Sequence, residues 1–262
     1  GHIYLIVMEN KESTSIVGSG DAPYINQLIQ QYGMAKNYTA ISHPSQPNYL
    51  ALWAGSTFGV TDDDKHNLTG ETLGDQIETA HMSWRVYAEN YPTSTSCYTG
   101  SSANGGPDGS GSYARKHNPA MSFTNLSGNS ERCRERITNF SHFDAGAADF
   151  SLIVPNLCHD MHDCPVKQGD AWLQQWLPQH ILNTSTWKDS NSAIFLTWDE
   201  GSTDGGGGGS VPLIVISHKT PAGFVSSKPY NHYSLLRTIE NAWGFDCLRD
   251  ACQAPGLSEF FP

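Results

Sequence analysis

The chain has 262 residues, and its 26 acidic residues outnumber its 15 lysines and arginines, which gives a formal net charge of −11. This acidic balance disfavours general nucleic-acid binding and tight docking on anionic membranes, because both need a basic surface. The length is sufficient for one α/β domain with a sizeable core, and no linker-like stretch divides it. An acidic surface that keeps a secreted protein in solution is the simplest explanation of the charge.

The six cysteines and five Asn-x-Ser/Thr sequons point to an oxidising compartment. An even number of cysteines fits three disulfides, and zinc binding by these thiols is less favoured because no paired CxxC spacing occurs. Other pairings are open, but short separations favour two local bridges and leave a third pair: Cys158 with Cys164, Cys247 with Cys252, and Cys97 with Cys133. The sequons begin at Asn37, Asn67, Asn125, Asn139 and Asn183. Sequons also arise by chance, but together with the cysteines they favour a secreted, extracellular glycoprotein.

The chain begins almost on its first predicted strand, residues 3–8, and shows no signal peptide or transmembrane run. We therefore expect a mature or trimmed product. The strand is an uninterrupted apolar run, which is typical of a buried parallel strand, and it ends in Glu9 and Asn10. Residues 11–21 are rich in Ser and Gly and predict a loop, whereas residues 23–33 predict a short helix.

Ser45 is predicted to lie on a turn between a strand that ends at residues 38–41 and a helix that starts near residues 49–53. A hydroxyl in that place faces the exposed amides of a helix N-terminus, which favour a bound phosphate or another anion. Taken alone, the residue fits an ordinary helix cap at least as well. The rest of the chain decides between the two interpretations.

Residues 61–65 form an acidic turn that fits a solvated loop better than a calcium site, because the oxygen spacing matches no complete calcium loop. Residues 72–81 predict a helix and residues 83–89 a strand. Residues 91–130 are dominated by Gly, Ser, Asn and Tyr and predict a long loop-rich insertion. Within it, residues 113–119 gather cationic and hydrogen-bonding groups, which we interpret as a phosphate-contacting lid or, alternatively, as a solvated loop.

A strand over residues 150–154 is followed by a cluster of polar side chains. The cluster consists of Asn156, His159, Asp160, His162 and Asp163. Clustered His and Asp side chains suit metals, phosphate or proton transfer, although a surface loop with incidental polar residues has the same composition. Residues 169–182 predict a helix whose apolar face is more typical of a core than of a lipid-binding stripe.

The strand predicted over residues 194–198 ends in Asp199 and Glu200, and a glycine-rich loop follows at residues 205–209. Ligands of open α/β sheets bind at the carboxyl ends of strands. Together with the end of the first strand and the turn at Ser45, this edge offers a hydroxyl, three carboxylates and an amide. All of these are oxygen donors suited to a divalent metal.

Strands and helices alternate throughout, with a last strand over residues 211–217 and a last helix over residues 232–243. This alternation predicts an α/β fold in which a mostly parallel central sheet is covered by helices on both faces, a three-layer sandwich. We expect the polar residues named above to meet at one edge of that sheet.

Six blocks of sequence resemble, in order, the signature blocks of a known family. They are residues 8–11, 43–49, 116–119, 155–163, 198–201 and 232–240. The family is the phosphoesterase family that joins bacterial-type phospholipases C and acid phosphatases, and it is related to the alkaline phosphatase superfamily. Six blocks in order over nearly the whole chain are a specific match. The resemblance implies an alkaline-phosphatase-like fold and a single phosphoesterase domain over residues 1–262.

The resemblance also implies the chemical groups of the site. Ser45 is the implied nucleophile, and residues 45–48 also resemble the Thr-x-Pro-Asn segment around the nucleophile of nucleotide pyrophosphatases. The implied metal ligands are Glu9, Asn10, Ser45, Asp199 and Glu200. The implied cofactor is a divalent cation, with zinc favoured and calcium or magnesium as alternatives. A sulfatase is disfavoured, because its motif requires Arg where this chain has Tyr49.

Two-metal members of the superfamily carry Asp where this chain has Asn156, which argues against a second metal, although Asp160 and His232 remain. We therefore assign the remaining polar residues to phosphate binding and leaving-group protonation, which imidazolium groups perform near acidic pH. His159 and His232 are the expected catalytic histidines. The expected substrate-binding residues are Asn48, His117, Asn156, Asp160 and His162.

The expected protein is a secreted, metal-dependent phosphoesterase that acts through a serine-bound intermediate on phosphomonoesters or on phospholipid headgroup diesters. The short chain favours the compact acid phosphatase branch, with a monomer that makes at most transient contact with a membrane surface. The alternative is a non-catalytic secreted protein that binds phosphate or a glycan. A serine esterase is disfavoured because no Gly-x-Ser-x-Gly elbow surrounds Ser45.

Overall fold

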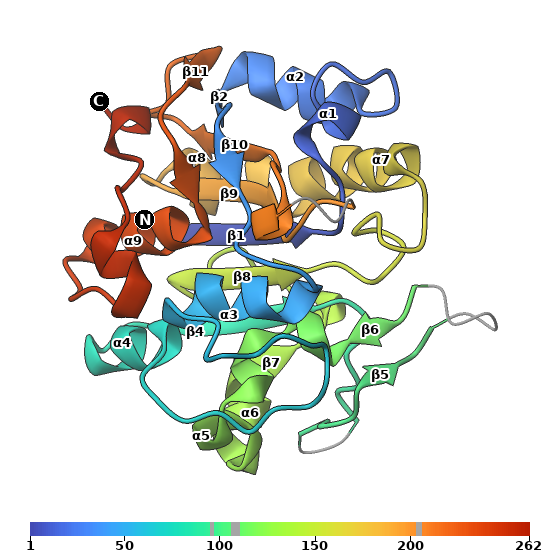
Figure 1. Cartoon of the computed structure of the whole chain (residues 1–262), viewed down its shortest axis with the longest axis vertical. Coiled ribbons are helices and arrows are strands. Elements are labelled where there is room, and N and C mark those ends of the chain that lie inside the picture. The colour runs from blue at the N-terminus through green and yellow to red at the C-terminus, as the bar shows by residue number, and fades with distance from the viewer. Residues whose placement is uncertain (95–96, 106–110, 203–205) are drawn as a thin grey trace.

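An eight-stranded sheet forms the centre of the structure, a computed structural model that describes residues 1–94, 97–105, 111–202 and 206–262 (Figure 1). Its strand order is β11-β2-β10-β9-β1-β8-β4-β7, and neighbouring strands are parallel except where β10 runs antiparallel to β9 and β2. The strands are β1 (Ile3–Met8), β2 (Gly33–Ala35), β4 (Trp84–Ala88), β7 (Ile137–Thr138), β8 (Phe150–Val154), β9 (Ala193–Trp198), β10 (Leu213–Ser217) and β11 (Phe224–Ser226).

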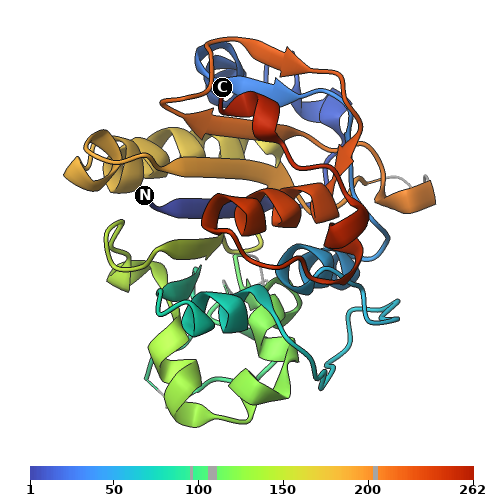
Figure 2. The same ribbon diagram turned by 90° about the vertical axis from the view of Figure 1, so that its left-hand side faces the viewer.

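Helices cover both faces of this sheet (Figure 2). One face carries α3, α4 and α9, and the other carries α2 and α7. The helices are α1 (Ser13–Ile16), α2 (Pro23–Gln31), α3 (Ser45–Ala54), α4 (Leu73–Thr79), α5 (Thr124–Ser127), α6 (Ser130–Arg136), α7 (Val166–Leu177), α8 (Ser185–Lys188) and α9 (His232–Trp243). The predicted α/β class, with a mostly parallel central sheet between helical layers, is confirmed.

Burial explains why the central strands read as continuous apolar runs. Every residue of β1, β8, β9 and β10 is buried, so side chains on both faces of these strands are mostly apolar. The two helices of one layer are joined by a buried carboxylate: Asp170 of α7 accepts hydrogen bonds from the free amides of Tyr24 (3.1 Å) and Ile25 (2.8 Å) at the start of α2. Such a partner satisfies donors that the helix itself cannot.

The strand register brings the candidate residues to one edge. Met8 of β1 pairs with Trp198 of β9, so the residues that follow them, Glu9 and Asp199, leave the sheet side by side. A separate small ribbon pairs β3 (Tyr38–Thr39) in parallel with β12 (Tyr230–Asn231), and it brings the chain before Ser45 to the start of α9. The carboxyl ends of the central strands therefore face the first turn of α3.

The structure corrects several predicted boundaries. Residues 11–21 were expected to be loop but contain α1, and the helix expected near residue 49 already begins at Ser45. The helix expected over 169–182 starts earlier, and the regular turns of α7 end before Pro178, which lacks the amide hydrogen needed to continue them; a π-helical turn (Pro178–Leu182) follows. The strand expected from residue 211 begins at Leu213, directly after Pro212.

The expected loop-rich insertion over residues 91–130 contains short elements. They are the hairpin strands β5 (Ser102–Ala103) and β6 (Tyr113–Ala114), the 3-10 turns η1 (Arg115–His117) and η2 (Pro119–Ser122), and α5. Residues 95–96 and 106–110 of this insertion, and residue 205 of the glycine-rich loop, lie outside the described residues. These elements are too short to be stable alone, so tertiary contacts must hold them.

All three predicted disulfides are present. They join Cys97 to Cys133, Cys158 to Cys164, and Cys247 to Cys252. The first ties the insertion to α6, and the second closes the loop that follows β8.

Across the described ranges, each helix is too short or too polar to cross a bilayer.

Candidate active site

Three buried carboxylates form the centre of the site. Glu9 follows β1, and Asp199 and Glu200 follow β9; one carboxylate oxygen of each lies within 4.8 Å of the others. The backbone amide of Asn10 donates to Asp199 Oδ1 at 3.1 Å, while Asp199 Oδ2 has no hydrogen-bond partner among the described residues. The prediction that these strand ends meet is confirmed by this geometry.

The cluster is electrostatically unfavourable by itself. Burial and the charge of Asp160 raise the pKa of Glu9 to about 8. Burial and the neighbouring charges of Glu9 and Glu200 hold the pKa of Asp199 well above its usual value. Three such groups within a few ångströms need either protons or a counter-cation. Oxygen donors of this kind, one of them without a partner, fit a divalent cation.

Ser45 is the first residue of α3, and its hydroxyl points at the cluster. The Oγ atom lies 2.9 Å from Glu200 Oε1 and 3.2 Å from Glu9 Oε2, and each of these carboxylate oxygens accepts a hydrogen bond from it. The residue before it, Pro44, holds the N-cap position, and the Ser45 side chain bonds carboxylates and not the helix amides. The helix-cap interpretation of Ser45 is therefore wrong, and its hydroxyl belongs to the carboxylate site.

Asn48 holds the turn in front of Ser45. Its Oδ1 accepts from the amides of Ile41 (2.9 Å) and Ser42 (3.1 Å), and its Nδ2 donates to the carbonyls of Ser42 (2.7 Å) and Pro44 (3.2 Å). These four bonds use the full capacity of an amide side chain. Asn48 was expected to bind substrate, but no donor is left over, so it shapes the turn instead.

The glycine-rich loop packs directly against the same turn. Gly208 has a φ of 76°, and a Cβ atom there would lie 2.6 Å from the carbonyl oxygen of Ser42. The amide of Gly201 also donates to the carbonyl of Gly208 at 2.7 Å. Both the left-handed backbone and the close approach require glycine. The loop after Glu200 thereby supports the turn that carries Ser45.

His117 and Asp160 line the other side of Glu9. His117 Nε2 lies 3.0 Å from Glu9 Oε1 without hydrogen-bond geometry, and its Nδ1 lies 3.6 Å from Asp160 Oδ2. Burial lowers the pKa of His117 well below its usual value, so the ring is neutral. The Tyr49 hydroxyl donates to Glu9 Oε1 at 2.7 Å, and its ring stacks on His117 with 5.0 Å between centroids. Two predicted substrate-binding residues therefore adjoin the cluster.

The loop after β8 places its other residues further out. Asn156 Oδ1 accepts from the amides of Cys158 and His159 at 3.0 and 2.9 Å, so this side chain shapes the loop. His159 Nδ1 lies 2.9 Å from Glu89, and the ring stacks on Trp172 with 5.4 Å between centroids. The structure thus brings His159 to Glu89 and Trp172 and not to the three carboxylates.

His162 lies beside His117 and Asp160. Its backbone amide donates to Asp160 Oδ1 at 2.7 Å, and its ring centroid is 6.2 Å from that of His117. The side chain is 30% exposed, and Nδ1 is paired with Asp163 at 2.7 Å. His162 is therefore a solvent-facing neighbour of the buried pair His117 and Asp160.

His232 lies behind the cluster. Its Nε2 donates to the backbone carbonyl of Asp199 at 2.6 Å, and its Nδ1 accepts from the Tyr38 hydroxyl at 2.8 Å. Burial lowers its pKa to about 4, so it is neutral. Sequence reasoning expected His232 to protonate a leaving group, but both ring nitrogens are used internally. The arrangement suits a residue that positions Asp199.

Sequence reasoning missed several partners of these groups. His43 Nδ1 bonds Glu200 Oε2, and Glu89 holds both His159 and the backbone amide of Asn156. His43 stands within the block of residues 43–49, so its place beside Ser45 was a usable signal. Glu89 carried no such signal, because only the parallel pairing of β4 and β8 brings it to this loop.

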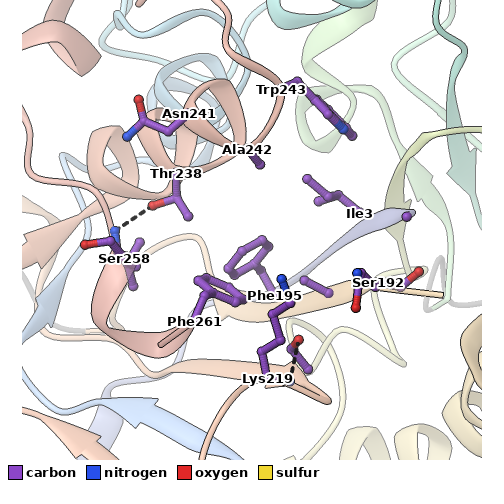
Figure 3. Close-up of a pocket in the computed structure, with 15 residues that line it drawn as sticks. Ile3, Ser192, Phe195, Lys219, Thr238, Asn241, Ala242, Trp243, Ser258 and Phe261 are labelled. Atoms are coloured by element: carbon purple, nitrogen blue, oxygen red, sulfur yellow. Dashed lines mark hydrogen bonds between the residues drawn. The ribbon is translucent and has the colours of Figure 1, made fainter.

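A separate pocket of about 490 Å³ lies at the opposite edge of the sheet (Figure 3). Ile3 and Ala193, the first residues of β1 and β9, line it together with Phe195, Trp243 and Phe261. The carboxylates follow the other ends of the same strands. This hollow therefore takes no part in the site described above.

The metal-free protein is expected to lose stability as the pH rises. Glu9 has a pKa of about 8 when folded against 4.5 for the free side chain, so in this window the folded state binds more protons than the unfolded state. The melting temperature in EDTA should therefore be lower at about pH 8 than at about pH 5, by about 2–4 °C for each kcal/mol lost. Glu9→Gln should make this dependence less steep, with the remainder due to Asp199, and an unchanged slope in that variant would contradict the assignment.

Comparison with solved structures defines the class of the fold. A protein of the alkaline phosphatase superfamily from Vibrio parahaemolyticus superposes with a TM-score of 0.63 over 96% of this chain and 69% of its own, at 13% identity. The phosphonate monoester hydrolase of Agrobacterium radiobacter gives a TM-score of 0.62 over 99% and 77%, at 10% identity. The fold is thus that of the alkaline phosphatase superfamily.

A sequence profile of the Phosphoesterase family matches residues 4–246, and the chain belongs to this family. It is 32% identical to the phosphatidylinositol-3-phosphatase of Mycobacterium tuberculosis over 271 residues, covering 99% of this chain and 82% of that protein. It is 33% identical to the phosphate-repressible acid phosphatase of Penicillium chrysogenum over 239 residues, covering 86% of this chain but about half (55%) of that protein. These relatives identify the chain as a phosphoric ester hydrolase.

Proposed function

We propose that the protein is a metal-dependent phosphoesterase in which Ser45 attacks phosphorus. The observation that supports this most is the position of the Ser45 hydroxyl, which donates to carboxylate oxygens of Glu9 and Glu200 at the N-terminus of a buried helix. The carboxylates orient the hydroxyl, and the positive end of the α3 helix dipole favours a phosphoryl group beside it. Attack forms the bond from Oγ to phosphorus while the hydroxyl proton passes to a carboxylate of the cluster. The bond from phosphorus to the ester oxygen breaks, and the substrate leaves as an alcohol after gaining a proton. Water then hydrolyses the phosphoserine and restores the hydroxyl.

A divalent cation would be held by the carboxylate cluster. The proposed ligands are Glu9, Asn10, Ser45, Asp199 and Glu200. When bound, the cation would lower the pKa of the serine hydroxyl and neutralise phosphoryl oxygens. We propose zinc from the family resemblance, although an all-oxygen donor set also suits calcium or magnesium. Two observations support a cation in this place: Asp199 Oδ2 has no hydrogen-bond partner in the part of the chain that the structure describes, and the pKa of Glu9 is raised.

The surrounding groups would bind phosphate and supply a proton. His117 and Asp160 adjoin Glu9, and His162 faces solvent beside them, so these three are proposed to contact the phosphoryl group. His159 remains the proposed proton donor to the leaving group, because its ring is partly exposed to solvent and Glu89 orients it. His232 is assigned to the positioning of Asp199.

The proposed substrates are phosphomonoesters or phospholipid headgroups, hydrolysed by a single-domain, monomeric, secreted glycoprotein. The three disulfides support an oxidising compartment. Four of the five sequon asparagines are exposed, whereas the Asn139 side chain is partly buried and donates to the carbonyl of Tyr91. We therefore expect glycans at the exposed sites and none at Asn139.

The test compares p-nitrophenyl phosphate, bis-p-nitrophenyl phosphate and phosphatidylcholine, each with and without EDTA. We expect at least one phosphate ester to be hydrolysed, the activity to disappear with the chelator, and zinc to restore it. Full activity in EDTA would indicate a metal-independent esterase. Binding of phosphate without turnover of any substrate would indicate a non-catalytic binding protein.

A further inference from the structure

Lys116 lies on the 3-10 turn η1 that also carries His117, next to the carboxylate cluster. Its ammonium donates to Asp63 Oδ2 at 2.9 Å, and the side chains of the two residues are 23% and 31% exposed. An ammonium group has three N–H donors, so one bond to Asp63 leaves capacity for a ligand. This half-buried cation has no role in the chemistry proposed so far.

Asp63 is fixed to the first turn of α3. Its Oδ1 accepts a hydrogen bond from the backbone amide of Gln46 at 3.0 Å. The side-chain amide of Gln46 donates to the carbonyls of Asp62 and Asp64 at 3.2 and 2.8 Å, so the whole acidic turn is tied to this residue. Because Asp63 uses one oxygen for the helix and the other for Lys116, it places the ammonium beside the turn that begins at Ser45.

The charge of Lys116 acts on the buried carboxylates. Burial lowers the pKa of Lys116, but the ion pair with Asp63 and the charges of Glu9 and Asp199 more than offset this and raise it. The same ammonium lowers the pKa of Glu9 and opposes protonation of His117. Lys116 is therefore a permanent positive charge close to the place where a phosphoryl group would bind.

A phosphomonoester and a phosphodiester differ in the charge they bring to this place. At neutral pH a monoester is largely a dianion, whereas a diester carries a single negative charge. A divalent cation among three carboxylates leaves no surplus positive charge, so a dianion needs a further cation. We propose that Lys116, held by Asp63, binds the second negative charge of the phosphoryl group and makes the site selective for phosphomonoesters. This inference rests on the proposed hydrolysis at Ser45 and names its substrate class.

The test uses Lys116→Met with p-nitrophenyl phosphate and methyl p-nitrophenyl phosphate at about pH 7, two substrates that differ by one methyl group and one charge. We expect kcat/KM for the monoester to fall about 10- to 100-fold, as for the loss of a hydrogen bond between charged groups. The diester should change by less than about threefold. Lys116→Arg should retain most of the preference, and Lys65→Met, an exposed lysine of the acidic turn, should alter neither rate.

Equal losses of kcat/KM on both substrates, or no loss on the monoester, would overturn the inference. If the ion pair between Lys116 and Asp63 only held the loop in place, its loss would affect both substrates alike. If Lys116→Met does not fold, Asp63→Asn replaces it and should lower monoester turnover selectively by a smaller factor. If the wild-type protein hydrolyses neither substrate, the proposed function fails, and calorimetry with inorganic phosphate decides the role of Lys116. An unchanged affinity of Lys116→Met for phosphate would then exclude Lys116 as a phosphate-binding residue. A tenfold or greater loss of affinity, about 1.4 kcal/mol or more, would support that role.

Discussion

Ser45→Ala is expected to lower kcat for a phosphate ester by about 10³-fold or more, because the variant lacks the atom that attacks phosphorus. The fold should be unaffected, since the hydroxyl makes no cap bond to the helix and Ala is well tolerated at a helix start. The measurement is steady-state kinetics on p-nitrophenyl phosphate, with thermal denaturation in parallel.

Ser42→Ala is the matched control for this variant. Ser42 lies on the same turn, but its hydroxyl donates to the carbonyl of His43 and not to a carboxylate. We expect its kcat to stay within about threefold of wild type, as for the loss of one partly exposed hydrogen bond. Similar activity in both variants would mean that Ser45 is not the nucleophile.

Asp199→Asn is expected to lower activity by about 10²-fold or more, because it removes one carboxylate from the proposed cation site. The same substitution is expected to have a favourable effect on the stability of the metal-free protein. Without metal, burial and the charges of Glu9 and Glu200 disfavour the Asp199 carboxylate, so a neutral amide should raise the stability of the metal-free protein.

Calorimetric titration with zinc and thermal denaturation in EDTA measure these two effects separately. Asp189→Asn, an exposed site after α8, is the control and should change neither quantity. Wild-type zinc affinity in Asp199→Asn would rule out Asp199 as a ligand. A lower melting temperature of this variant in EDTA would show that the cluster is not repulsive.

The sequence was sufficient to predict which strand ends meet. Glu9 and Asp199 each follow an apolar run, and parallel strands with helical crossovers end at the same edge of a sheet. Two of the three disulfides followed from short separations, and the third followed as the remaining pair of an even set. These features depend on local pattern and on general rules of topology, both of which can be read from one chain.

The roles of individual polar residues could not be predicted in the same way. His232 and Tyr38 are 194 positions apart, and only the pairing of β3 with β12 joins them. Asn48 stands in a family block like Ser45, yet its amide is used by its own turn. A motif indicates that a residue is near the site, whereas its hydrogen-bond partners are set by the tertiary structure.

The identity of the nucleophile is tested most directly by rapid acid quenching during turnover of p-nitrophenyl phosphate, followed by mass spectrometry of the peptide that contains residue 45. We expect this peptide in the wild-type protein to carry the additional mass of one phosphoryl group, located on Ser45. The same peptide from Ser45→Ala should carry none. Product release without a phosphorylated Ser45, or a phosphoryl group found on another residue, would contradict the proposed mechanism.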